Sequence, residues 1–162
     1  MKLVICEKPS VAKAVASALG VTSRADGCFE GNGLIVSWCV GHLVSPMDAA
    51  GYDTSYKKWK YDDLPILPEP FRYVLAKGKE EAFQNLKRLM ERPDVTELVN
   101  ACDAGREGEL IFRLVYEMAG CRKPFYRLWI SSMEDVAIRE GFADLRPGAE
   151  YDPLSQSALC RQ

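Results

Sequence analysis

Two groups of acidic residues follow apolar runs that are typical of buried strands. Glu7 comes directly after the run 2–6, and the loop Asp103-Ala-Gly-Arg-Glu107-Gly-Glu109 follows the run 97–102. Such positions, at the carboxyl edge of a doubly wound sheet, are where that fold places its ligand site. Carboxylates from two strand ends would form an oxygen-rich site for Mg²⁺, which favours carboxylate ligands and retains several waters. The pattern therefore predicts metal-assisted phosphoryl chemistry.

Within the acidic loop, the spacing of the acidic residues predicts which of them point in the same direction. Asp103 and Glu107 are four residues apart and face the same way if a helix begins early, whereas Glu109 is expected to point elsewhere, at the surface. The two glycines of the loop permit close approach of a ligand to the backbone. Arg106 suits phosphate oxygens as well as carboxylates. Capping of a helix N-terminus would explain the same acids without any chemistry, and the residues alone leave that alternative open.

Three further features have both a functional and an ordinary interpretation. Lys8 follows Glu7 and precedes a proline that pre-sets a helix start, which fixes the direction of both side chains. His42 is the single histidine of the chain, and a lone His after a Gly is more often a hydrogen-bonded turn residue than a catalyst. The cluster Lys57-Lys-Trp-Lys60 either holds a nucleic-acid backbone beside a stacking aromatic ring or is a solvated loop.

The surrounding elements alternate between strand and helix. Strand patterns cover residues 2–6, 34–40, 95–102 and 125–131, and helical patterns cover 10–19, 79–91, 107–119 and 133–143. This alternation predicts an α/β fold with a mostly parallel sheet flanked by helices on both faces. Gly31-Asn-Gly33 predicts a β-hairpin over residues 28–40, so an antiparallel pair should lie near one edge. Residues 43–76 lose all periodicity and form a long Pro-rich loop.

Composition narrows the class of protein. A chain of 162 residues with 48% hydrophobic content fits one domain, and a formal net charge of −2 favours neither a nucleic-acid-coating nor a membrane-surface protein. No apolar run approaches the roughly 20 residues of a membrane span, and the charged N-terminus is unlike a signal peptide. Six scattered cysteines without a C-x-x-C pair favour a reduced, cytoplasmic setting.

Three segments together resemble the Toprim domain of type IA DNA topoisomerases, with the greatest likeness to the bacterial topoisomerase III group. They are residues 3–16 with the run E-K-P-S, residues 37–43 with W-C-x-G-H-L, and residues 100–109. The resemblance continues through residues 61–68 and 157–161. It implies a Toprim-like (Rossmann-like) domain over residues 1–148, followed over residues 149–162 by the start of a truncated next domain that completes no element.

The resemblance also implies a chemistry. In that family a tyrosine attacks a phosphate of single-stranded DNA, and the break is later resealed without a nucleotide cofactor. Glu7 would assist proton transfer at the 3′-oxygen, while Lys8 and Arg106 would contact the phosphate. Asp103 and Glu107, with Glu7, would hold Mg²⁺. His42 would line the site or contact DNA. The implied protein has no membrane partner and is a bacterial, nucleoid-associated protein of the cytoplasm.

Two departures from the family pattern matter. The usual acidic motif is D-x-D-x-E, and its middle acid is here Gly105, which predicts a weaker, one-metal site completed by Glu7, Glu109 or water. The family's Tyr-x-Arg motif does not occur in these residues, so the chain by itself is expected not to cleave DNA. The rival interpretations are another Toprim nucleotidyl-transfer or nuclease domain, a non-catalytic DNA-binding Toprim module, and a receiver-like phosphate-binding domain.

Overall fold

A seven-stranded sheet forms the centre of the molecule. The structure, a computed structural model, describes residues 1–58 and 60–162. The strand order is β2-β3-β4-β1-β7-β8-β9. The strands are β1 (Lys2–Cys6), β2 (Ser23–Ala25), β3 (Cys28–Gly31), β4 (Leu34–Trp38), β7 (Glu97–Ala101), β8 (Phe125–Arg127) and β9 (Arg146–Pro147). The central strands β4, β1, β7 and β8 are parallel, and antiparallel pairs lie toward both edges. The predicted mostly parallel α/β sheet is therefore confirmed.

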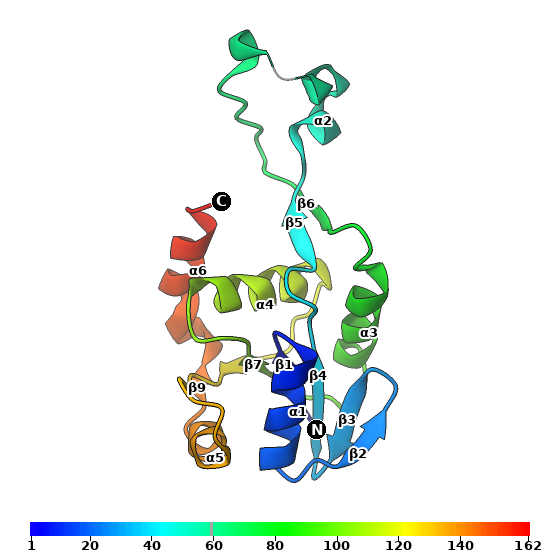
Figure 1. Cartoon of the computed structure of the whole chain (residues 1–162), viewed down its shortest axis with the longest axis vertical. Helices are drawn as coiled ribbons and strands as arrows, with labels where there is room; N and C mark the ends of the chain where they lie inside the picture. Colours follow the sequence, from blue (N-terminus) through cyan, green and yellow to red (C-terminus); the bar gives the residue numbers. More distant parts are fainter. Residues whose placement is uncertain (59) are drawn as a thin grey trace.

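Helices cover both faces of this sheet (Figure 1). They are α1 (Pro9–Ala18), α3 (Glu80–Met90), α4 (Arg106–Met118), α5 (Asp135–Ala143) and α6 (Asp152–Leu159). Side chains of a strand alternate between faces, so Leu3 and Ile5 pack into one cluster with α3 and α4, while Val4 and Cys6 pack into another with α1 and α5. No helix in the described part of the chain is long and apolar enough to cross a bilayer.

The hairpin between β3 and β4 has the turn that its sequence predicts. Asn32 and Gly33 both have positive φ, 51° and 73°, which is the requirement of a two-residue type I′ turn. The strands pair antiparallel from Gly31 with Leu34 onward. The Asn32 amide also donates to the carbonyl of Gly20, 2.9 Å away, which joins the turn to the end of α1. The edge strands β2 and β9 are three and two residues long, which is too short to produce a recognisable strand pattern in the sequence.

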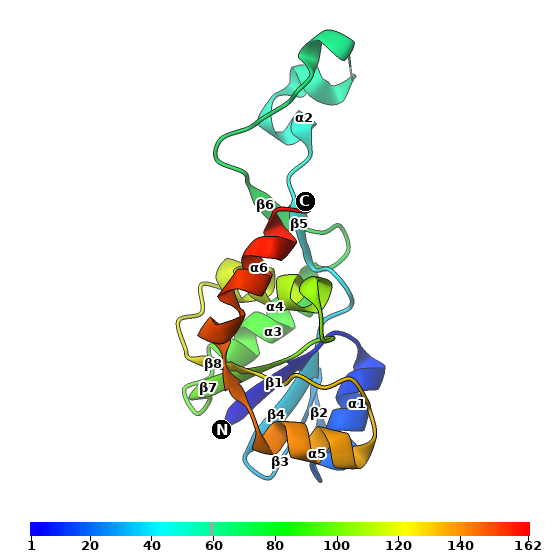
Figure 2. The same ribbon diagram turned by 90° about the vertical axis from the view of Figure 1, so that its left-hand side faces the viewer.

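The Pro-rich stretch forms an arm that projects away from the sheet (Figures 1 and 2). Its base is an antiparallel pair, β5 (Val44–Pro46) with β6 (Tyr73–Leu75). Between them lie α2 (Ala49–Tyr52) and the 3₁₀ turns η1 (Thr54–Lys57) and η2 (Tyr61–Asp63). The expectation of a loop without elements is therefore wrong at the base, because three-residue strands are too short to show periodicity. In the cluster 57–60, Trp59 lies outside the described residues.

The last residues form a complete short helix. After the 3₁₀ turn η3 (Gly148–Tyr151), α6 begins at Asp152 with a proline in its first turn and packs on α4. Ala158 of this helix is buried in the same cluster as α4. The expectation that residues 149–162 complete no element is wrong, because α4 offers α6 an apolar face. A domain boundary at residue 148 stays a prediction.

Phe112 provides a test of this packing. The residue is fully buried, and its ring lies 5.8 Å from Tyr116 and 5.1 Å from Phe125 between ring centroids. We expect Phe112→Ala to lower the free energy of unfolding by about 3–5 kcal/mol in urea denaturation, because it opens a cavity under the sheet. Tyr61→Ala on the arm, where the residue is 90% exposed, should change it by less than about 0.5 kcal/mol. Equal losses would contradict the assigned core.

Candidate active site

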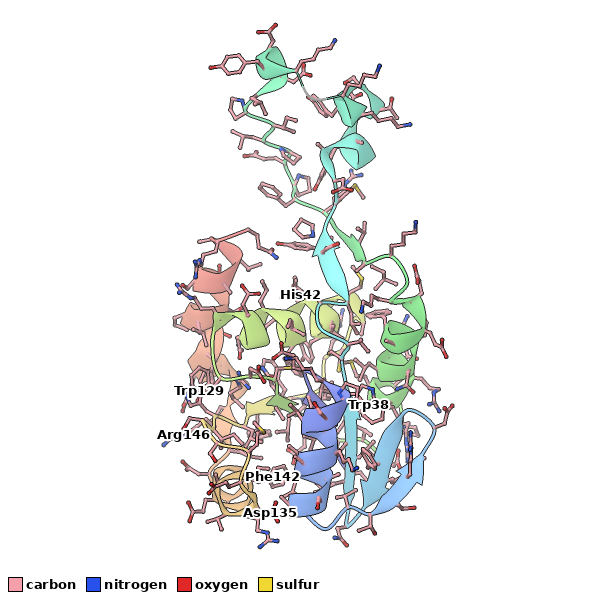
Figure 3. The ribbon with its side chains drawn as sticks, in the orientation of Figure 1. Trp38, His42, Trp129, Asp135, Phe142 and Arg146 are labelled. Atoms are coloured by element: carbon pink, nitrogen blue, oxygen red, sulfur yellow. The ribbon has the colours of Figure 1, made fainter. Side chains whose placement is uncertain are left out.

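The carboxyl ends of three adjacent parallel strands meet at one edge of the sheet. β1 lies between β4 and β7, and Cys6 is in register with Trp38 on one side and Ala101 on the other. Beyond the strands the chains stay together, since the amide of Cys39 donates to the carbonyl of Cys6 at 2.8 Å. Glu7, His42 and Asp103 therefore leave the sheet beside one another. In Figure 3, His42 is labelled in the connection between β4 and β5.

Glu7 and Asp103 are in contact at this edge. The backbone amide of Asp103 donates to Oε2 of Glu7 at 3.4 Å. Partial burial raises the pKa of the Glu7 carboxyl above its ordinary value. The side chain of Asp103 raises this pKa further, through a hydrogen bond and its charge, while the backbone amide of Asp103 and the charge of Lys8 act in the opposite direction. Two neighbouring carboxylates thus share one region of negative potential, and such a pair favours either a shared proton or a bound cation.

The backbone of the acidic turn requires its two glycines. Gly105 precedes α4 with φ 154° and ψ 177°, a conformation that residues with a side chain rarely adopt. A Cβ on Gly108 would overlap the carbonyl oxygen of Asp103, so the first turn of α4 sits directly on that peptide. No side chain caps the N-terminus of α4. The capping alternative for Asp103 is therefore wrong, and the first N–H groups of α4 have no side-chain acceptor among the described residues.

Glu107 is paired with the only histidine. Oε2 of Glu107 lies 3.0 Å from Nε2 of His42, and their side chains are 73% and 42% exposed. The structure brings Glu107 to His42 but not into a three-ligand cluster with Glu7 and Asp103. Within residues 1–58 and 60–162, no group of three or more His, Cys, Asp or Glu residues is arranged to hold a metal ion.

Glu7 and Asp103 nevertheless fit the requirements of Mg²⁺. This ion commonly binds one or two carboxylates and fills its remaining positions with water and substrate phosphate oxygens. Burial and the charge of Asp103 raise the pKa of Glu7 despite the opposing effects of Lys8 and the Asp103 amide, so this pair of carboxylates would gain from a bound cation. Glu107 would join them only by leaving His42, through rotation of an exposed side chain.

The two predicted phosphate-binding residues are free to act. Lys8 and Arg106 are exposed, and neither forms an ion pair with another described residue. Lys8 stands at the N-cap of α1 and Arg106 begins α4, and neither helix N-terminus has a side-chain cap. Uncapped helix N-termini attract anions through their free N–H groups and the helix dipole. This edge of the sheet therefore combines carboxylates with anion-binding groups.

Glu109 has a different place from the predicted one. It is fully buried, and its carboxylate accepts from Asn100 at 3.0 Å and from Arg113 at 2.9 Å. Nε of the equally buried Arg127 lies 3.0 Å away. The expectation of a surface residue or spare metal ligand is wrong, because two arginines and an amide already occupy this carboxylate. The spacing of Glu109 and Arg113, four residues apart on a helix, is the signal that could have found the pair.

Comparison with known proteins agrees with this geometry. The family profile of the Toprim domain matches residues 2–133. The chain belongs to the Toprim domain family. It is similar to DNA topoisomerase 3 of Bacillus subtilis (46% identical over 159 residues, 98% of this chain) and of Shouchella clausii (45% over 160 residues, 99% of this chain). It spans 22% of the length of each of these relatives.

A solved structure shares the fold. Full-length topoisomerase I from Thermotoga maritima superimposes with a TM-score of 0.57 at 22% identity, over 90% of this chain and 21% of that one. The resemblance of the sequence motifs to topoisomerase Toprim domains is therefore confirmed. In this Toprim domain, Glu7, Lys8, Asp103, Arg106 and Glu107 all lie at or beside the carboxyl edge of the sheet.

The raised pKa of Glu7 predicts how pH affects stability. Stability associated with the protonated carboxyl is present below the ordinary pKa of Glu, about 4.3, and is lost as the pH rises through the raised pKa. In metal-free buffer at neutral pH, Glu7→Gln should therefore melt at a higher temperature than the unaltered protein. Its advantage should shrink as the pH falls toward about 4.

A matched substitution makes this test specific. Glu140 is exposed on α5, away from the acidic edge. Glu140→Gln should leave the melting temperature almost unchanged at both pH values. A Glu7→Gln protein that is less stable than the unaltered one at neutral pH without metal would refute the repulsion between Glu7 and Asp103.

Proposed function

We propose that this chain is the N-terminal catalytic Toprim domain of a DNA topoisomerase III. The reaction would be Mg²⁺-assisted cleavage and religation of single-stranded DNA by transesterification, which relaxes or decatenates DNA. The nucleophilic tyrosine would come from a part of the polypeptide outside these residues. The observation that carries the proposal is the contact between Glu7 and Asp103, at the ends of adjacent parallel strands and beside exposed Lys8 and Arg106.

Glu7 is suited to move a proton at the 3′-oxygen of the broken strand. A general acid works best when its pKa lies near the working pH, and burial together with Asp103 moves the pKa of Glu7 in that direction. The carboxyl would give its proton to the leaving 3′-oxygen during cleavage. It would take the proton back when that oxygen attacks the phosphotyrosine during religation.

Lys8 and Arg106 would bind the reacting phosphate. An ammonium and a planar guanidinium stabilise the charge that spreads over the phosphate oxygens during transfer. The uncapped N-termini of α1 and α4 add backbone donors at the same edge. His42, held by Glu107, would line the site or contact the DNA strand.

Glu7, Asp103 and Glu107 are the residues that would hold Mg²⁺. When bound, the ion would neutralise the paired carboxylates and orient the phosphate and the 3′-hydroxyl for religation. Because Gly105 replaces the middle acid, the chain supplies fewer ligands and favours a single ion. A cytoplasmic, nucleoid-associated location goes with this proposal, because chromosomal DNA would be the substrate.

The corresponding experiment uses the full-length protein and negatively supercoiled DNA. Relaxation should require Mg²⁺ and stop when the ion is chelated. Glu7→Ala should lower cleavage and religation together, by about 100-fold or more, the usual contribution of a positioned acid–base group. Asp103→Ala and Glu107→Ala should impair religation more than cleavage, so that cleaved DNA accumulates.

The control is Glu140→Ala, which should relax DNA at the unaltered rate. Wild-type religation in both Asp103→Ala and Glu107→Ala would refute the metal assignment. Hydrolysis of DNA or primer synthesis without a covalent protein–DNA link would favour a nuclease or nucleotidyl-transfer Toprim domain. DNA binding without any cleavage would favour a non-catalytic module.

A further inference from the structure

Arg127, at the end of β8, is a buried arginine without a role in the chemistry proposed above. It is fully buried, yet it makes a dense set of polar contacts. One terminal nitrogen donates to the carbonyls of Asn100 (3.1 Å), Cys102 (2.6 Å) and Leu128 (3.1 Å). The other donates to the carbonyl of Asp103 at 2.7 Å. Its contacts therefore concentrate on the peptides that lead out of β7 into the acidic turn.

The carbonyls of Cys102 and Asp103 need such a partner. β7 ends at Ala101, so the pairing of the sheet no longer satisfies these groups. Cys102 is buried, and a buried carbonyl without a partner costs about 1–3 kcal/mol, whereas the hydrogen bond at the Asp103 carbonyl is partly buried. The guanidinium of Arg127 is a rigid planar fork and can hold both carbonyls in one geometry, whereas an ammonium is a single point donor. The orientation of the Asp103 peptide is thus tied to Arg127.

A second contact traps the same peptide from the opposite element. The first turn of α4 lies so close that a Cβ on Gly108 would overlap the Asp103 carbonyl oxygen. The N–H of Asp103 points to Glu7. The main chain of Asp103 is therefore held on both sides: its carbonyl lies between Arg127 and α4, and its N–H is directed toward Glu7, the acid with which Asp103 would share the ion.

One buried carboxylate balances the charge of Arg127. Nε of Arg127 lies 3.0 Å from the buried carboxylate of Glu109. Asn100 donates to Glu109 from its amide nitrogen, and its amide oxygen accepts from the backbone of Cys102. Trp129, labelled in Figure 3, covers the guanidinium with its ring centroid 5.0 Å from Cζ. The support beneath the acidic turn is therefore closed off from water.

We propose that Arg127 is a positioning residue, which fixes the backbone of the acidic turn so that the Asp103 carboxylate can bind the divalent cation together with Glu7. The inference rests on the proposed function, because it concerns the metal site of that reaction. Residues behind metal ligands commonly change metal affinity by about 10–100-fold when they are replaced. Arg127 acts in the same way, through the main chain of the ligand.

Arg113 offers a matched control for the purely structural alternative. It also pairs with Glu109, at 2.9 Å, but its other contacts are Asp152 and the carbonyl of Gly148 in the C-terminal segment. Neither contact reaches the acidic turn. If Arg127 only neutralises Glu109, replacing either arginine should have the same effect on metal binding.

The experiment compares two charge-balanced double variants of the full-length protein, Glu109→Gln with Arg127→Met and Glu109→Gln with Arg113→Met. The first pair of substitutions leaves Arg113 with Asp152. The second leaves Arg127 its four carbonyl acceptors, and the amide oxygen introduced by Glu109→Gln can still accept from its Nε. Mn²⁺ binding is measured without DNA from the electron paramagnetic resonance signal of the free ion, and the melting temperature is measured alongside. We expect the Arg127 double variant to bind Mn²⁺ at least about 10-fold more weakly. The Arg113 double variant should keep the unaltered affinity.

Each outcome decides the inference. Equal affinities in the two double variants would refute the positioning role of Arg127 alone. Absence of Mn²⁺ binding by the unaltered protein would refute the metal site and this inference with it. If the Arg127 double variant does not fold, Arg127→Lys decides instead: it keeps the charge beside Glu109 but not the fork, so its Mn²⁺ affinity should also fall, and an unchanged affinity would overturn the inference.

Discussion

The parallel pairing of β1 between β4 and β7 is the constraint on which the rest of the structure depends. Parallel strands end at the same edge, so residues separated by almost a hundred positions leave the sheet together. The register places Cys6 level with Trp38 and Ala101. Each strand is buried on both faces, by α1 and α5 on one side and by α3 and α4 on the other. This edge is therefore held by the core of the domain and not by flexible loops.

The electrostatics of the edge follow from that register. The strand ends bring two carboxylates together. Partial burial reduces the hydration that would otherwise stabilise both charges and screen the repulsion between them. The backbone amide of Asp103 stabilises the ionised Glu7 carboxylate, whereas the charge of the Asp103 side chain opposes ionisation, and a proton or a cation would relieve that repulsion. Gly105 adds a backbone limit, since its φ of 154° suits glycine and makes an aspartate at that position strained. Glycine in place of the middle acid of the family motif therefore suits the backbone conformation of this turn.

Beneath the exposed acids lies a second polar layer that water does not reach. There Glu109 pairs with two arginines and accepts a hydrogen bond from Asn100, and one of these arginines, Arg113, pairs also with Asp152. Burying such charges stabilises a protein little, because desolvation offsets most of the attraction. Its benefit is geometric, since buried hydrogen bonds have fewer alternative arrangements than contacts with water. Arg113 extends this layer to Asp152 and Gly148, so the segment before α6 is joined to the helix that begins at the acidic turn.

Most elements, and most of the residues at the strand ends, could be predicted from local patterns in the sequence. Apolar runs and helical periodicity are local properties, so the central strands, the main helices and the Asn32–Gly33 turn could be predicted without coordinates. Glu7, Lys8, Asp103 and Arg106 could be placed at one edge for the same reason, because the position of a residue just after a strand is visible in the sequence.

Which acids come into contact depends on the packing of elements that are distant in the chain. Glu109 lies in the same short motif as Asp103, yet it turns into the core, because helix α4 directs it toward Asn100 and an arginine 18 positions further along the chain. Glu107 pairs with His42, which no local pattern indicates. The pairing of β5 with β6 at the base of the arm and the packing of α6 on α4 could not be predicted from the sequence either. In each case the deciding partner is distant in the chain, and sequence periodicity carries information only about neighbours.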